Sequence, residues 1–321
     1  MSTIDRRSLI AALGSSLLAG VAFPAWGETE KPPAEGGLGG TGIVGTLMGF
    51  GSLLVNGLEV ETEGATAYSS TLGAFDPSSL AIGQTLTIEA ATEGAGLVAK
   101  RVHVTYPVVG AAEVLAGAGR LRVAGIDVVA EPDGMTAVRP GARVLVSGVW
   151  RDDVVVAGRI DPAPDGAVSA IAGAVRRDGR TGRLSLGGRP LQLAAGIETP
   201  ADGSFVTVRG RALGDRFVAD DLVPGRFTGA AGPLVRLSVD GYLEPIASPP
   251  RYEIAGFGHS FDADADLAPF RNVRALFRGP YVGTFAVENG IILPEAFRAR
   301  QALIEQLATR PGSVPVISAR A

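Results

Sequence analysis

The segment from His259 to Asp266 holds the densest group of side chains that could do chemistry in this chain. Asp262, Asp264 and Asp266 alternate with other residues, as acids do at the start of a calcium-binding loop, and His259 adds an imidazole that can bind a metal. A full loop of that type also needs a glycine at its sixth position and an acid at its twelfth, and this segment has neither. The pattern therefore allows an irregular divalent-cation site at His259, Asp262, Asp264 and Asp266, and a solvated loop is the simpler interpretation.

The same segment narrowly misses the motif of a serine nucleophile. Ser260 follows His259, but Asp262 stands where the motif G-x-S-x-G requires a glycine for its tight turn from strand to helix. The chain has no cysteine and two histidines, which excludes cysteine nucleophiles, thiolate metal sites and a three-histidine zinc site within one chain. We assign no catalytic residue and no cofactor, apart from the divalent cation just described. His103, the other histidine, is expected to be a partly buried packing or hydrogen-bonding group.

Two aromatic residues are candidates for contact with a ligand. Trp150 follows a predicted strand, Tyr242 is the second, and small β-barrels often stack bases or sugars on such rings. Packing at the edge of a core is the simpler interpretation of both residues.

The string from Gly40 to Gly45 fits the dinucleotide motif G-x-G-x-x-G. A strand follows it where that motif needs a helix, so we assign these glycines to a close strand crossing.

The composition is typical of a folded protein with many turns. Hydrophobic residues make up 46% and charged residues 19% of the 321, and there are 45 glycines and 21 prolines, which favours short strands over helices. The formal net charge of −4 provides no attraction to nucleic acid, which is not expected as a partner. Lys31 and Lys100 are the two lysines. The remaining basic residues are arginines, a bias that would suit capture of phosphate or carboxylate groups but usually reflects genome base composition.

The first 27 residues have the pattern of an export signal. Arg6 and Arg7 form a charged start, Leu9 to Val21 form a moderately apolar stretch, and small residues at Ala25 and Gly27 suit cleavage. The arginine pair also fits a twin-arginine signal. The apolar stretch is too short to span a bilayer, so we expect a periplasmic or otherwise extracytoplasmic protein with no transmembrane segment after signal cleavage. Residues 28–40 are polar and rich in glycine and proline, and they predict a flexible tether.

Three short strings recur in the same order four times along the rest of the chain. The first is an alternating strand that ends in a glycine, at Gly57, Gly125, Gly188 and Gly256. The second is a strand that ends in Ala90 in the first copy and in a glycine in the others, at Gly148, Gly210 and Gly279. A third strand follows after a short turn, as in a hairpin. Each copy thus has four or five short strands, about the minimum that can bury a core, and rolling them into a barrel removes exposed edges.

We therefore predict an all-β fold of about four tandem, small, OB-like β-barrels and a C-terminal helix. The expected barrels span 41–107, 108–163, 164–227 and 228–293. Residues 294–321 are expected to form the helix and a tail, because Pro294 and Glu295 suit the first turn of a helix and Pro311 and Gly312 suit its end. The apolar stripe of this helix should dock against the last barrel.

The first copy resembles an uncharacterised bacterial family, a domain of unknown function found in exported proteins as repeated small barrels related to the OB architecture. The resemblance covers residues 40–106 and rests on four short strings, at 42–45, 55–60, 82–84 and 98–102. The later copies lack the Asn before glycine and the Gly-Gln pair of the first. The resemblance implies a small-barrel fold and no established activity.

These observations favour a non-enzymatic extracytoplasmic protein that binds or scaffolds an envelope protein or a small ligand. One alternative is a metal-handling protein or hydrolase centred on the loop of His259 and Asp262. Another is an oligosaccharide-binding module that uses Trp150 and Tyr242.

Overall fold

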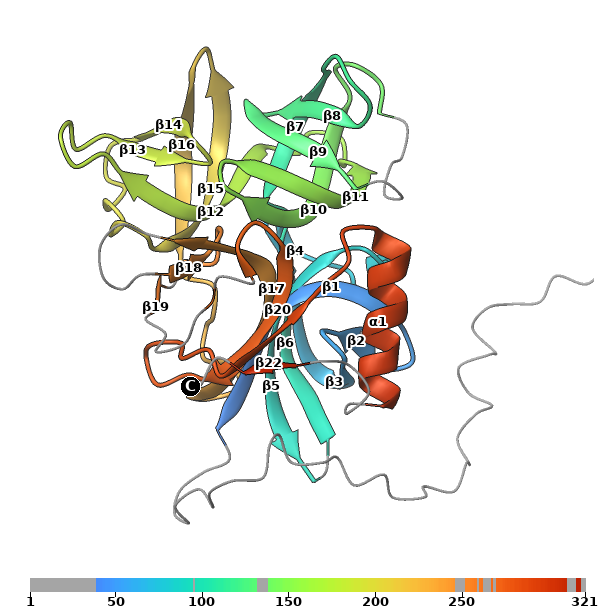
Figure 1. Ribbon diagram of the computed structural model, residues 1–321. Coiled ribbons are helices and arrows are strands. Elements are labelled where there is room, and N and C mark those ends of the chain that lie inside the picture. Colours follow the sequence, from blue (N-terminus) through green and yellow to red (C-terminus); the bar gives the residue numbers. More distant parts are fainter. Residues whose placement is uncertain are drawn as a thin grey trace, which may run out of the picture.

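The computed structural model describes residues 39–94, 96–131, 138–245, 252–258, 260–261, 267, 270–310 and 316–318. The side chains of 260, 261 and 318 are outside that description. The chain forms many short strands and one helix near its C-terminus (Figure 1), which confirms the predicted all-β class. The predicted signal segment lies outside the described residues, as does the tether up to residue 38.

The first copy is a closed five-stranded barrel with a hydrogen-bonded order of β1-β2-β3-β6-β5-β1. Neighbouring strands are antiparallel except β3 and β6, which are parallel. A short strand β4 (Gly73–Ala74) pairs with the end of β3, and a single 3-10 turn follows at Pro77–Ser79. The barrel strands are β1 (Gly40–Gly49), β2 (Leu53–Val55), β3 (Leu58–Ser70), β5 (Thr85–Glu93) and β6 (Gly96–Val104).

The second and third copies repeat this closed order. The second is β7-β8-β9-β11-β10-β7 and the third is β12-β13-β14-β16-β15-β12, each with one parallel pair in the same place. Tandem OB-like barrels are thus confirmed. The second barrel has strands β7 (Val108–Val114), β8 (Arg120–Val123), β9 (Ile126–Ala130), β10 (Arg143–Arg151) and β11 (Val154–Pro162). The third has β12 (Ser169–Arg177), β13 (Leu184–Leu186), β14 (Arg189–Leu193), β15 (Phe205–Leu213) and β16 (Arg216–Pro224).

The fourth copy keeps the strand order but is an open arc in the part of the chain that the structure describes. Its strands pair as β19-β18-β17-β20-β21, and β21 then pairs with β22 instead of with β19. The closing parallel pair of the other copies is absent among these residues. The strands are β17 (Leu234–Pro245), β18 (Tyr252–Ile254), β19 (Ser260–Phe261), β20 (Arg274–Pro280), β21 (Asn289–Ile292) and β22 (Ile317–Ser318).

The recurrent glycine of the second string marks a β-bulge. The register of the hairpin shifts at Gly148 in the second barrel and at Gly210 in the third. A Cβ at either position would overlap a carbonyl oxygen of the facing strand, and a Cβ at Gly279 of the fourth copy would overlap the carbonyl oxygen of Ala286 before β21. The first barrel has its bulge at Ala90, the smallest residue that carries a Cβ. The repeat in the sequence therefore records a backbone crossing in each copy.

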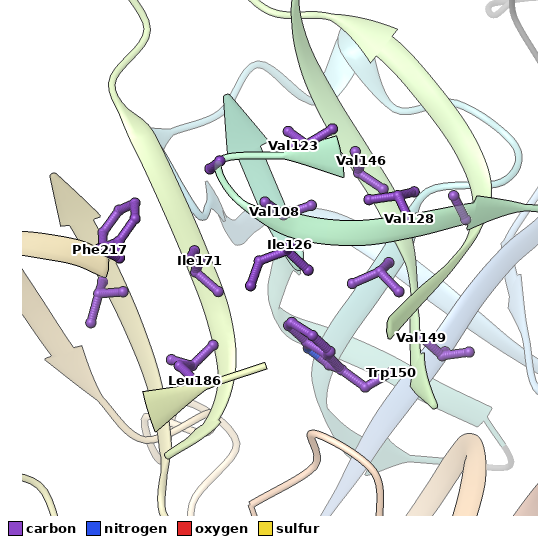
Figure 2. Close-up of a cluster of buried hydrophobic side chains, with 14 of the residues drawn as sticks. Val108, Val123, Ile126, Val128, Val146, Val149, Trp150, Ile171, Leu186 and Phe217 are labelled. Atoms are coloured by element: carbon purple, nitrogen blue, oxygen red, sulfur yellow. The ribbon is translucent and has the colours of Figure 1, made fainter. Parts of the chain in front are cut away.

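The copies pair two by two through their opening strands. The first half of β1 lies parallel to β17, and the first half of β7 lies antiparallel to β12. In each closed barrel the second half of the opening strand pairs with the next strand of its own copy. Figure 1 shows the second and third barrels side by side above the first barrel and the fourth copy. The second and third barrels also share one hydrophobic core, part of which is drawn in Figure 2.

The linker that enters the fourth copy is held by a buried carboxylate of the first barrel. Glu89 is fully buried and accepts hydrogen bonds from the backbone N–H groups of Thr228, Gly229 and Ala230, at 2.7 to 2.9 Å. Its carboxylate also pairs with Arg101 at 3.1 Å. Hydrogen bonds to a carboxylate are among the stronger ones in proteins, so Glu89 fixes the path of this linker.

The helix α1 (Phe297–Thr309) docks on two copies at once. It contacts β1, β2 and β3 of the first barrel. Its buried Ile304 and Leu307 share an apolar cluster with Met48 of the first barrel and Leu276 of the fourth copy. The sequence predicted docking against the last barrel alone, because the pairing of the first and fourth copies is not visible in it. Within the described residues, no helix has the length and apolar character to cross a membrane.

Two cations and two anions are buried together where these parts meet. Arg274 donates to both oxygens of Asp240 at 2.7 Å and to Glu131 at 2.5 Å, and Arg300 donates to Glu131 at 2.6 Å. All four residues are at most 4% exposed. Burial alone would lower the pKa of Arg274, but Asp240 and Glu131 raise it above its usual value. The network joins the second barrel, the fourth copy and α1, and Thr46 of the first barrel accepts a further bond from Arg274 at 3.1 Å.

Removal of one charge from this network should be costly. We expect Glu131→Gln to lower the free energy of unfolding by about 3–5 kcal/mol, because it leaves Arg300 buried without a carboxylate. Chemical denaturation measures the change. The matched control is Asp220→Asn, which removes the carboxylate from an exposed pair with Arg211 and should cost at most about 1 kcal/mol. Equal losses in the two variants would contradict a structural role for the network.

Candidate functional site

A groove of about 920 Å³ lies between the second and third barrels. Its walls come from strands and turns of both barrels, and the paired strands β7 and β12 each supply part of its lining. Eight charged residues line it: Arg122, Arg143, Arg189, Arg211, Glu113, Asp127, Asp153 and Asp215. We call it the inter-barrel groove. The lining therefore has four cations and four anions.

A glycine turn of the second barrel makes room for an arginine of the third. The turn between β8 and β9 holds Ala124 and Gly125 at φ values of 48° and 83°, in the left-handed region. A Cβ on Gly125 would overlap the guanidinium of Arg189, which comes from β14. Gly110 on β7 likewise leaves space for the side chain of Ala124. Gly125 therefore has two roles: it forms the turn of the β8–β9 hairpin, and it leaves the space that the Arg189 guanidinium occupies in the groove.

Arg189 has no ion pair among the described residues. One of its terminal nitrogens, Nη2, donates to the carbonyl oxygens of Gly214 at 2.8 Å and Arg216 at 3.0 Å. Its Nε–H is buried and has no hydrogen-bond partner. Burial lowers the pKa of Arg189, and Asp215 opposes that effect. The side chain is a partly buried cation with an unused donor.

Arg143 of the second barrel also has no ion pair among the described residues. It begins β10 of the second barrel, and its Nη2 donates to the hydroxyl of Ser169 on β12 at 3.2 Å. Its Nε–H is also buried without a partner. By contrast, Arg122 pairs with Asp127 at 2.7 Å, and Arg211 pairs outside the groove with Asp220. Two of the four arginines therefore form an ion pair with a carboxylate. Among the described residues, the other two donate hydrogen bonds to neutral groups alone.

The predicted metal site cannot be located in the fold. His259, Asp262, Asp264 and Asp266 all lie outside the described residues, so their cation-binding role stays a prediction. In the part of the chain that the structure describes, no three His, Asp or Glu side chains come together as metal ligands would.

Trp150 and Tyr242 come together in one buried cluster. Trp150 is 5% exposed and donates from Nε1 to the carbonyl of Ala172 at 2.9 Å. Tyr242 is 1% exposed, and its hydroxyl donates to Glu295 at 2.6 Å. Burial and this bond raise the pKa of the Tyr242 phenol. Trp150 thus links the second barrel to the third, and Tyr242 links β17 to the segment before α1. Their ligand-binding role stays a prediction.

Figure 2 shows Trp150 among apolar residues of two barrels, with Ile126 of the second and Leu186 of the third close to it. An edge of Trp150 also lines a smaller cavity of about 280 Å³. Asp152, Asp153 and Glu244 line the same space. Burial raises the pKa of Glu244, which accepts a bond from the backbone N–H of Asp152 at 2.7 Å.

A serine and a histidine lie together in the first barrel. Ser69 and His103 face each other across the parallel pair of β3 and β6, with 2.9 Å between Oγ and Nδ1. Burial, together with the nearby charges of Arg101, Arg226 and Arg209, lowers the pKa of His103 to about 3. A general base works best with a pKa near the working pH, so this neutral histidine does not suit base catalysis. It matches the hydrogen-bonding role that we expected for His103.

The sequence shows two features of the inter-barrel groove, an excess of arginine over lysine and the recurrent glycines that end the first string. It does not show that residues 125 and 189 come together, because that contact arises from the packing of two barrels. That packing follows from the pairing of β7 with β12, two strands that each look like an ordinary barrel strand.

A protein-family model described as a domain of unknown function, DUF5666, matches residues 41–103. The matched residues are those of the first barrel, from β1 to β6. This agrees with the resemblance found in the same part of the sequence. No curated protein and no solved structure matches the chain.

The low pKa of His103 predicts a pH-dependent stability. The unfolded chain takes up a proton near pH 6.5, whereas the folded chain does so near pH 3, so the stability is full above about pH 6.5 and falls as the pH decreases toward 3. In His103→Asn, the free energy of unfolding should depend less on pH in this window, by up to about 1.4 kcal/mol per pH unit. Chemical denaturation at pH 7.5, 5.5 and 4.5 measures this. Parallel curves for the two proteins would show that His103 is protonated in the folded state.

Proposed function

We propose that this chain is a non-enzymatic binding or scaffolding protein of the cell envelope and that the inter-barrel groove is its binding surface. The ligand is an envelope protein or a small molecule. The observation that carries the proposal is the groove itself, a polar space of about 920 Å³ with charged side chains from two barrels. Pockets that bind small molecules have volumes of about 300–1,000 Å³.

The construction of the groove supports a binding role. Its walls are joined by the strand pair β7–β12 and by a common hydrophobic core that includes Trp150, Ile171 and Val208. Walls held in this way are ordered before a ligand arrives, so little conformational entropy is lost on binding. Glycines at the β8–β9 and β13–β14 turns bring backbone to the surface of the groove, where a ligand can approach closely.

The location in the envelope is part of the proposal. It rests on the charged and apolar pattern of residues 1–27, which is typical of an export signal. The family match adds no activity to that pattern, since the family itself is described as one of unknown function.

Blocking the groove should abolish binding. Ala111 is exposed on β7 and lines the groove, so Ala111→Trp places a large ring in the space. We expect this variant to lose a partner that crosslinks to the tagged wild-type protein in intact cells, or a small molecule that native mass spectrometry finds on it. The matched control is Ala195→Trp, since Ala195 is exposed on the third barrel and does not line the groove. Equal retention by both variants would refute the groove as the binding surface.

A further inference from the structure

We propose that the inter-barrel groove binds a single anionic group, a carboxylate or a phosphate, carried on a polar and otherwise uncharged ligand. Arg143 and Arg189 are the residues that hold it. The inference rests on the proposed function, because it assigns a ligand chemistry to the same groove.

Unused donors are the first argument. Arg143 and Arg189 each have a buried Nε–H without an acceptor, and both side chains line the groove. Most buried polar groups in native proteins are hydrogen-bonded, and an unpaired donor on a charged group is especially unfavourable. In this arrangement the Nε–H groups are closed off from solvent, so an oxygen of a bound ligand supplies the missing acceptor when the side chain turns toward the groove.

Unmatched charge is the second argument. Among the described residues, neither Arg143 nor Arg189 forms an ion pair, although Arg122 beside them is matched by Asp127. Arg189 has carbonyl partners and Arg143 has a hydroxyl partner. A guanidinium that lacks a carboxylate partner attracts an anion, and the attraction is greater where the side chain is partly buried than where it is fully exposed. The planar fork of the guanidinium matches the oxygens of carboxylate and phosphate groups.

The third argument is position. Arg143 comes from the second barrel and reaches Ser169 of the third, whereas Arg189 comes from the third barrel and lies over Gly125 of the second. The two cations therefore cross the groove in opposite directions. An anion that reaches both side chains would contact both barrels.

The other charges limit the ligand to one anionic group. Glu113, Asp127, Asp153 and Asp215 line the same groove, so its charged residues balance. A polyanion such as a nucleic acid would place further negative charges near these acids and be repelled. A ligand with one anionic group and a polar, neutral body meets the two arginines without that penalty, and the groove has room for such a body.

The test is calorimetric titration of the full chain with inorganic phosphate, glucuronate and glucose. We expect at least one of the two anions to bind and glucose to bind at least about tenfold more weakly than that anion. In the double variant Arg143→Gln and Arg189→Gln, binding of the anion should weaken at least about tenfold, since hydrogen bonds to charged groups are lost. The control is the double variant Arg180→Gln and Arg183→Gln, which makes the same charge change at two exposed arginines outside the groove and should bind as the wild type does.

A second pair of variants keeps the test decisive if the glutamine variant does not fold. Arg143→Lys and Arg189→Lys retain the charge and the aliphatic stem but lose the Nε–H and the planar fork. Each should weaken binding of the anion several-fold and leave the circular dichroism spectrum unchanged. Binding of phosphate alone identifies a phosphorylated ligand, and binding of glucuronate alone identifies a carboxylated one.

Binding of neither anion would overturn the inference, and so would wild-type affinity in the glutamine or lysine variants. These failures differ from failure of the proposed function. If Ala111→Trp loses its cellular partner while no anion binds, the groove remains the binding surface and its ligand is not anionic. If an anion binds through Arg143 and Arg189 while Ala111→Trp keeps its partner, the anion site stands and the partner binds elsewhere.

Discussion

Arg274 and Arg300 are removed from water together with Asp240 and Glu131, and the contact between the second barrel, the fourth copy and α1 depends on that burial. A buried ion is tolerated when its partners are in place, and here the partners belong to the second barrel, the fourth copy and the C-terminal helix. None of these parts can be completed alone without leaving a charge unmatched. The repeats of the sequence are therefore one cooperative unit in the structure. Glu89 has the same effect at another contact, since it holds the linker of the fourth copy against the first barrel.

The inter-barrel groove depends on a separate contact, the one between the second and third barrels. A groove between two independent barrels would change its width whenever the linker between them moved. Here the second and third barrels share strand hydrogen bonds and a hydrophobic core, and Trp150 lies in that core. Gly187 and Gly256 each approach the Trp150 ring so closely that a Cβ would overlap it, which brings turns of the third and fourth copies against the second barrel. Trp150 thus joins three copies, and Arg189 of the groove is held by backbone carbonyl groups.

Local features of the fold were predictable, and contacts between copies were not. Alternation and recurrent glycines identified the barrels, because each glycine marks a turn or a bulge within one copy. Pro294 and Glu295 placed the start of α1 within three residues of Phe297. The position of α1 on the first barrel and the groove depend on pairings between opening strands that have similar sequences. The roles of Arg143 and Arg189 could not be separated from those of other arginines, since exposure and pairing are decided by the neighbouring copy.

The parallel pairing of β1 with β17 has a consequence for the evolution of such chains. Solenoid proteins lengthen by duplication because each unit contacts only its neighbours and a new unit can be added at the end. In this chain the first copy pairs directly with the last, and the middle two pair with each other. An inserted fifth copy would find no free opening strand, and a deleted one would expose an edge. Strand pairing therefore ties the copies together in two pairs, and loss of any one copy would leave the opening strand of its partner without that neighbour.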